Sequence, residues 1–191
     1  MHEPAEQIFE RYLRSLGVDI DADPELAGTA ARFTTLMRER FAAAPEPVPI
    51  RAIEAPASPG VAQVIVVSRI PVRAMCAHHL MPFVGTVSVA YLPERHIVGF
   101  GALHRLVDGL SLGPQLQERL THALVHALHG ALAPRWTAVR IRARQTCAEM
   151  TFGGRRTVAT TLATRGDVTP AEAWTFVSGR PTAGHAANHD P

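Results

Sequence analysis

Two adjacent segments constrain the fold more than any other part of this sequence. Residues 114–133 carry leucine at every fourth position, which places an apolar stripe on one face of a helix that Pro114 is suited to begin. Residues 139–144 then alternate apolar side chains with three arginines, the period of a strand with one buried face. Because each segment has a single apolar face, the pair predicts a helix packed on a sheet. The leucines are Leu116, Leu120, Leu124, Leu128 and Leu132, and the arginines are Arg140, Arg142 and Arg144.

The remaining periodic segments predict an α+β fold. Helical spacing at 5–16 and at about 28–43 predicts an N-terminal helical hairpin, and strand signals follow at 64–67, 86–91 and 158–162. A short helix at 103–110 precedes the long one, and this order of elements indicates a mainly antiparallel sheet. We expect a helical region at 1–45, a proline-rich loop at 46–60, a folded catalytic domain at 61–177 and a disordered tail at 178–191.

The composition excludes several classes of protein. The chain has 191 residues, 47% of them hydrophobic and 19% charged, which is enough for one domain with a real core. The net charge is only +2, and the sequence has no dense block of lysine and arginine, so we expect no nucleic-acid partner. The interpretation favoured for the three arginines is a solvated face of a strand. No run is long and apolar enough to predict a membrane span, and the N-terminus does not resemble a secretory signal. We therefore expect a cytoplasmic protein.

The two cysteines indicate a possible metal site. Cys76 begins the sequence Cys76-Ala77-His78-His79, and Cys147 lies much further along the chain. Two thiolates and one imidazole can hold zinc and leave a fourth position open, the arrangement of a catalytic site. The spacing alone leaves open a second interpretation, a buried thiol beside an ordinary histidine. If the strand at 139–143 continues, Gln145 and Cys147 point to the same side of it.

Longer motifs resemble the GTP cyclohydrolase I family over about residues 5–175. The resemblance rests on four segments: residues 76–85 (CAHHLMPFVG), 91–93 (YLP), 116–121 (LQERLT) and the surroundings of Cys147. It implies the tunnelling fold, in which an antiparallel four-stranded sheet carries two helices on one face. It also implies a homodecamer of two pentamers, with active sites at the subunit interfaces.

The resemblance implies a role for each candidate site residue. Zinc activates a water that attacks C8 of a guanine-type purine substrate, and a histidine protonates the ring so that the imidazole opens. A carboxylate binds the guanine edge, because N1–H and the 2-amino group are adjacent donors. By this resemblance the zinc ligands are Cys76, His79 and Cys147, the proton-transfer residue is His78, the guanine anchors are Glu118 and Gln117, and the phosphate contacts are Arg105 and Arg32.

The departures from the family cluster around this expected pocket. Gln145 stands where the family has a second catalytic histidine, and Ala77 replaces a glutamate. Family cations are replaced by Ala102, Thr151 and Thr35. The missing cations predict a substrate with fewer phosphates than GTP, and Gln145, which cannot titrate, predicts a reaction that stops before a pterin forms.

Alternative interpretations stay open on the sequence. The chain could be a non-catalytic paralogue that binds a purine or pterin, or that regulates an active partner in a mixed oligomer. His78 could be merely packed and Glu118 merely solvated. A solvated helix face is favoured over a metal site for His122, His126 and His129.

Overall fold

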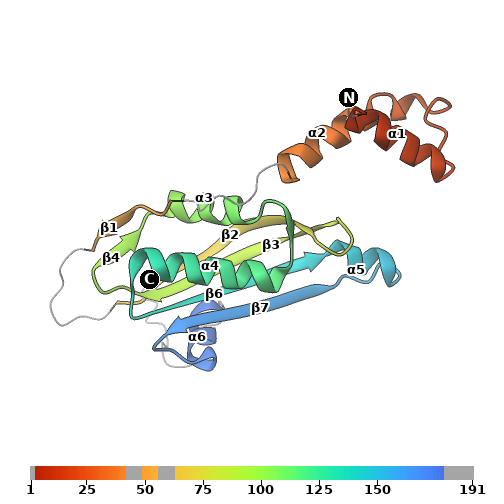
Figure 1. Ribbon diagram of the computed structural model, residues 1–191. Helices are drawn as coiled ribbons and strands as arrows, with labels where there is room; N and C mark the ends of the chain where they lie inside the picture. Colours follow the sequence, from red (N-terminus) through yellow and green to blue (C-terminus); the bar gives the residue numbers. More distant parts are fainter. Residues whose placement is uncertain (1–2, 42–48, 56–62, 179–191) are drawn as a thin grey trace, which may run out of the picture. The chain divides into compact units, whose positions relative to one another are not determined.

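The computed structural model describes residues 3–41, 49–55 and 63–178 (Figure 1). The chain divides into two compact units, residues 1–44 and residues 45–191, and each is described by itself. The predicted tail at 178–191 lies outside the described residues except for Ser178. None of the helices in the described ranges is long and apolar enough to cross a membrane.

The first unit is the predicted helical hairpin. Helix α1 (Ala5–Ser15) and helix α2 (Thr29–Phe41) are joined through a short 3-10 helix, η1 (Pro24–Leu26). The Phe9 and Phe33 rings stack with their centroids 4.0 Å apart, so aromatic packing holds the two helices together. The predicted boundaries of both helices are confirmed to within about two residues.

The second unit contains a five-stranded sheet in the order β5-β2-β3-β6-β7. Strands β2 (Ile65–Cys76), β3 (Pro82–Leu92), β6 (Trp136–Gln145) and β7 (Val158–Gly166) are antiparallel, as predicted. The prediction of four strands needs one correction, because β5 (Pro114–Gln115) pairs in parallel with β2 at the edge. A second small sheet pairs β1 (Ala52–Glu54) with β4 (His96–Val98), so part of the segment expected to be a proline-rich loop is a strand.

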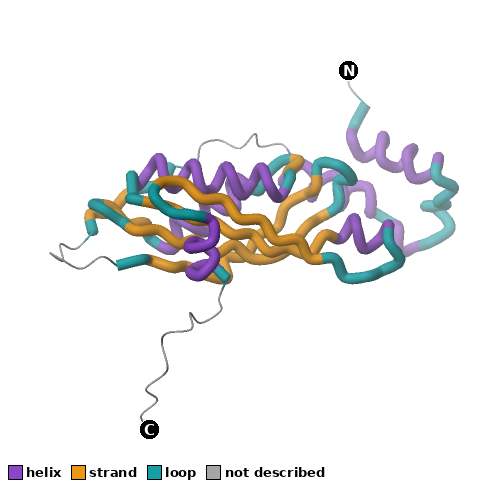
Figure 2. The backbone as a smooth tube through the Cα atoms, turned by 90° about the horizontal axis from the view of Figure 1, so that it is seen from below, coloured by secondary structure: helices purple, strands orange, loops and turns teal. Residues whose placement is uncertain are grey.

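Helices cover both faces of the large sheet (Figure 2). Helix α3 (Phe100–Leu110) and helix α4 (Gln117–Leu132) pack on one face as predicted, and the leucine stripe of α4 meets Val139 and Ile141 there. Helix α6 (Pro170–Val177) was not predicted and packs on the opposite face against Trp136 and Ala138. This opposite face carries the arginine stripe, and the guanidinium carbon of Arg140 lies 5.5 Å from the Trp174 ring.

Two predicted boundaries near the site are wrong. Helix α4 begins at Gln117, because Pro114 and Gln115 extend as strand β5 along β2. Strand β6 ends at Gln145, and Cys147 lies in a short helix, α5 (Thr146–Thr151). The argument that one continuous strand aligns Gln145 with Cys147 therefore fails, although both residues line the same pocket.

Candidate active site

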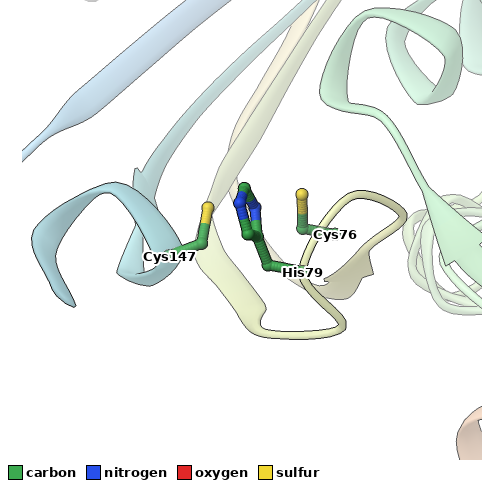
Figure 3. A group of neighbouring side chains, drawn as sticks. All are labelled: Cys76, His79 and Cys147. Carbon is green, nitrogen blue, oxygen red and sulfur yellow. The ribbon is translucent and has the colours of Figure 1, made fainter. Parts of the chain in front are cut away.

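Three possible metal ligands meet at one end of the large sheet (Figure 3). Cys76 is the last residue of β2, His79 lies in the turn before β3, and Cys147 lies in the first turn of α5. Their sulfur and nitrogen ligand atoms all lie within 4.8 Å of one another. Tetrahedral zinc separates such ligands by about 3.5–4 Å, so only small adjustments are needed to close the set around an ion.

The turn that carries His79 is held by its own backbone. The Leu80 N–H donates to the Cys76 carbonyl and the Cys76 N–H donates to the Met81 carbonyl, each at 2.8 Å. Leu80 has a φ of 52°, a left-handed conformation that is uncommon for a residue with a side chain. The tight reversal brings His79 back beside Cys76 at the end of the strand.

Helix α5, which carries Cys147, is anchored through Thr146 and Glu149, on either side of the cysteine. The Arg144 Nε donates to both carboxylate oxygens of Glu149 at 2.8 Å, and Glu149 is buried. The Arg144 guanidinium holds the pKa of Glu149 below its usual value. The Thr146 hydroxyl donates to the Pro82 carbonyl at 2.5 Å, which ties the start of α5 to β3. Together these contacts fix the position of Cys147 relative to the sheet.

The electrostatics of the two thiols favour a bound cation. Burial raises the pKa of the Cys147 thiol, and the neighbouring Cys76 raises it further. A cation between the sulfurs reverses this effect because it stabilises both thiolates. Two thiols and an imidazole are a donor set that suits zinc, and the residues present therefore fit this ion.

A pocket of about 260 Å³ opens beside the three ligands. Seven of the predicted site residues line it, from the turn, helix α4, strand β6 and helix α5: Cys76, His78, His79, Gln117, Glu118, Gln145 and Cys147. Glu118 is exposed in the first turn of α4, and His78 is exposed beside His79. An acid, a histidine and a metal-ligand set thus surround one space.

A partly buried hydrogen-bond chain supports two other residues that line the pocket, Gln117 and Gln145. The Gln145 amide donates to Gln117 Oε1 at 2.6 Å, and the Gln117 amide donates to the Ile141 carbonyl and to Thr161 Oγ1, each at 3.2 Å. Thr121 Oγ1 lies 2.6 Å from Thr161 Oγ1. Sequence reasoning missed Thr121 and Thr161, since only the packing of α4 on β7 brings them together.

Neither of the two predicted phosphate contacts is among the described residues that line this pocket. Arg105 is exposed on α3 and lines a separate hollow of about 680 Å³ together with Arg51 and Ala102. Arg32 belongs to the first unit, where its guanidinium donates to the Ala27 carbonyl and to Thr29 Oγ1.

The histidines of α4 do not form a metal-ligand group among the described residues. His126 contacts Arg165, and His129 Nδ1 lies 3.3 Å from Thr137 Oγ1. These partners agree with the interpretation of an ordinary helix face.

The fold and the site define a class: an α+β protein in which two cysteines and a histidine that could hold a metal ion lie beside a pocket lined by Glu118. The chain matches the family described as GTP cyclohydrolase I over residues 5–175. It belongs to the GTP cyclohydrolase I family.

Its curated relatives carry the same name. The GTP cyclohydrolase 1 of Streptococcus suis (strain 05ZYH33) is 38% identical over 149 residues, which cover 78% of this chain and 79% of the relative. The GTP cyclohydrolase 1 of Leifsonia xyli subsp. xyli (strain CTCB07) is 34% identical, with 81% and 82% covered. The GTP cyclohydrolase 1 of Corynebacterium glutamicum (strain R) is 37% identical, with 81% of each chain covered. These relatives make the chain GTP cyclohydrolase I-like over most of its length.

Proposed function

We propose that this protein is a zinc-dependent hydrolase that opens the imidazole ring of a guanine-type purine carrying fewer phosphates than GTP. The observation that carries the proposal is the pocket itself, where a complete metal-ligand set adjoins Glu118. The positions of three family cations, in contrast, hold Ala102, Thr151 and Thr35. Selective loss around the phosphates fits a changed substrate better than a lost activity.

Cys76, His79 and Cys147 hold the zinc ion in this proposal. Zinc bound there supplies a Lewis acid that activates water near neutral pH. The anchoring of α5 through Arg144 and Glu149 keeps the Cys147 sulfur in place for this ion. Preorganised ligands lose less entropy when they bind, so these contacts strengthen the site.

Two exposed side chains in the pocket act on the purine. Glu118 presents two carboxylate oxygens to N1–H and the 2-amino group, the adjacent donors of the guanine edge. Glu118 lies exposed in the first turn of α4, where it lines the pocket. His78, beside the ligand His79, gives a proton to the imidazole ring as the ring opens.

The chemistry balances with water as the only co-reactant. Water adds across the C8–N7 double bond, and as the C8–N9 bond breaks the C8 hydroxyl becomes the formyl carbonyl. His78 gives its proton to N9, and the proton released from the hydroxyl restores His78. The product is a formamidopyrimidine. Later steps toward a pterin need further proton transfers, and Gln145 has no pKa near neutrality with which to assist them.

This chain has few cations with which to bind the phosphates of a nucleotide. Each charge-assisted hydrogen bond to a phosphate contributes about 1.5–3 kcal/mol, so losing several lowers the affinity for GTP by orders of magnitude. Arg105 and Arg32 are the cations we propose for any phosphate that remains.

We also propose a homodecamer in the cytoplasm with sites shared between subunits. The pocket of one chain, about 260 Å³, is smaller than the usual ligand site, which measures about 300–1,000 Å³. A neighbouring subunit that closes the pocket would complete it, and Arg32 of that subunit would then reach the substrate. A monomer by light scattering at micromolar concentration contradicts this part of the proposal.

The deciding experiment is to incubate the zinc-loaded protein with GTP, GMP, guanosine and guanine and to identify products by mass. We expect a product heavier than its substrate by one water, formed faster from a less phosphorylated compound than from GTP. We do not favour the non-catalytic alternative, because the metal ligands and Glu118 share one pocket. Stoichiometric zinc with no product from any of the four compounds would reverse that choice.

A further inference from the structure

The hydrogen bonds around Gln117 have only one consistent set of directions. The Ile141 carbonyl can only accept, so the group of Gln117 that lies 3.2 Å from it is the amide nitrogen. The Gln117 oxygen therefore faces Gln145, and Gln145 meets it with its own amide nitrogen at 2.6 Å. The orientation of the Gln145 side chain thus follows from a backbone carbonyl.

Two threonines complete the hydrogen-bond chain, and their donor and acceptor roles are also fixed. The Thr121 hydroxyl donates its one hydrogen to the Gln117 backbone carbonyl at 2.7 Å. Thr161 must then donate to Thr121 across the 2.6 Å contact, and it accepts from the Gln117 amide with a lone pair. Gln117 and Thr121 are 4% and 1% exposed, so breaking this chain leaves polar groups buried without partners.

From these directions we infer that Gln145 offers the pocket a hydrogen-bond acceptor, its Oε1, and that Gln117 is the positioning residue that keeps it there. One N–H of the Gln145 amide is bonded to Gln117, and among the described residues no protein group donates to Oε1. A ligand that uses this acceptor therefore has a hydroxyl or N–H group facing Gln145 Oε1.

The ligand class follows if the proposed function holds, since this step rests on it. A guanine-type nucleoside has its donors in two places, the N1–H and 2-amino edge and the ribose hydroxyls. Glu118 takes the edge in the proposed function, so the ribose hydroxyls remain to meet Gln145. The preferred substrate is thus a ribonucleoside; the free base lacks the matching donor, and so does whichever deoxynucleoside has lost the hydroxyl that faces Gln145.

The first experiment measures dissociation constants of guanosine, 2′-deoxyguanosine and 3′-deoxyguanosine on the zinc-loaded protein. We expect one deoxynucleoside to bind about two- to twelvefold more weakly than guanosine, the usual range for one hydrogen bond. Gln145→Met removes the acceptor, so the ratio of the deoxynucleoside and guanosine dissociation constants should fall to one. Gln117→Met should also reduce the ratio, although this residue does not contact the ligand in our inference.

A matched pair of variants separates positioning from general loss of stability. Thr161→Val removes the hydrogen bond that the Gln117 amide donates to Thr161, and it should reduce the ratio of the deoxynucleoside and guanosine dissociation constants. Thr137→Val makes the same change at a fully buried position on β6 that contacts His129 instead, and should keep the ratio. Equal ratios in both variants and in the unmodified protein would count against the positioning role.

A second measurement tests the orientation of the Gln145 amide in the absence of a ligand. A double-mutant cycle of Gln117→Met and Gln145→Met, read as unfolding at fixed protein concentration, should show a coupling of about two- to twelvefold in the unfolding equilibrium. Absent coupling overturns the hydrogen-bond chain. Present coupling with equal binding of all three nucleosides overturns the ribose contact alone. If guanosine does not bind at all, the proposed function fails together with the ribose contact, and the cycle still decides the orientation.

Discussion

One group of pocket residues, the metal side, is Cys76, His79 and Cys147, which lie on a tight turn and a short helix at the end of the sheet. A second group, the amide side, is Gln117 and Gln145, which extend from the long helix α4 and from strand β6. The first side consists of groups that ionise and can hold a cation. The second consists of amides that do not ionise, and each amide has a fixed hydrogen-bond direction.

This difference separates two parts of the chemistry. In the proposed function the metal side activates water, whereas the amide side can recognise a ligand but cannot carry a proton. The bonds of Gln117 hold the Gln145 amide in one orientation, which suits recognition of a ligand. The proposed function therefore combines a metal end that activates water with an end where the family's proton-transfer residue is replaced.

The largest effect should come from breaking the metal side. Cys147→Ser replaces a thiolate with a hydroxyl that binds zinc far more weakly, and we expect zinc content to fall from one ion per subunit to almost none. Metal analysis of the purified protein checks this. Ala148→Ser, in the same helix, keeps all three ligands and serves as the control. Unchanged zinc in Cys147→Ser would remove this residue from the ligand set.

Restoring a titratable group on the amide side should have the next largest effect. In Gln145→His, Gln117 Oε1 is positioned to accept from one ring N–H, which leaves the other ring nitrogen to face the pocket. A proton-transfer group contributes typically about 10²–10⁴-fold to its step, so products beyond the ring-opened compound should increase. Mass analysis combined with pterin fluorescence measures the change. Efficient pterin formation by the unmodified protein would show that Gln145 is not limiting.

Placing a cation in the hollow that Arg105 lines tests whether residues outside the metal side and the amide side decide between GTP and guanosine. Ala102→Lys places an ammonium group in the hollow that Arg105 lines, and kcat/KM for GTP should rise by about tenfold or more relative to guanosine. His104→Lys adds the same charge at an exposed position of α3 and controls for net charge. A rise of equal size in both variants would indicate general electrostatic steering instead.

How well the sequence predicted each helix or strand depended on the length of that element. The period of α4 and the alternation of β6 predicted the helix and the strand, because both are long enough for a pattern to repeat. Strand β5 has two residues and helix α5 has six, too few to show a period, so the true surroundings of Cys147 were missed. Helix α6, with eight residues, was missed for the same reason, although Thr169 and Glu172 form a capping box at its start.

The site was predictable where its residues are close in sequence or belong to a family motif. Cys76 and His79 are three residues apart, and Glu118 lies in a matching segment. The link from Gln117 to Thr161 joins residues 44 positions apart through the packing of α4 on β7. No local pattern encodes such a contact, and so the direction of the Gln145 amide became available only from the fold.

The smallest effect concerns acid stability, which we expect to depend on His129, a residue on α4 that does not line the pocket. Burial lowers the pKa of His129 below its unfolded value, and the nearby Arg165 and His126 lower it further. The unfolded state then binds the proton more readily than the folded state. Stability is therefore unaffected well above pH 6.5 and falls as the pH drops through about 6.5 toward the folded pKa.

His129→Gln should remove this part of the pH dependence, because glutamine does not titrate and can still bond to Thr137. We expect the thermal midpoint of the unmodified protein to drop more between pH 7 and pH 5.5 than that of the variant, at equal protein concentration. His122→Gln, an exposed position on the same helix, should keep the steeper slope. Identical slopes in the unmodified protein and His129→Gln would place the acid sensitivity elsewhere in the protein.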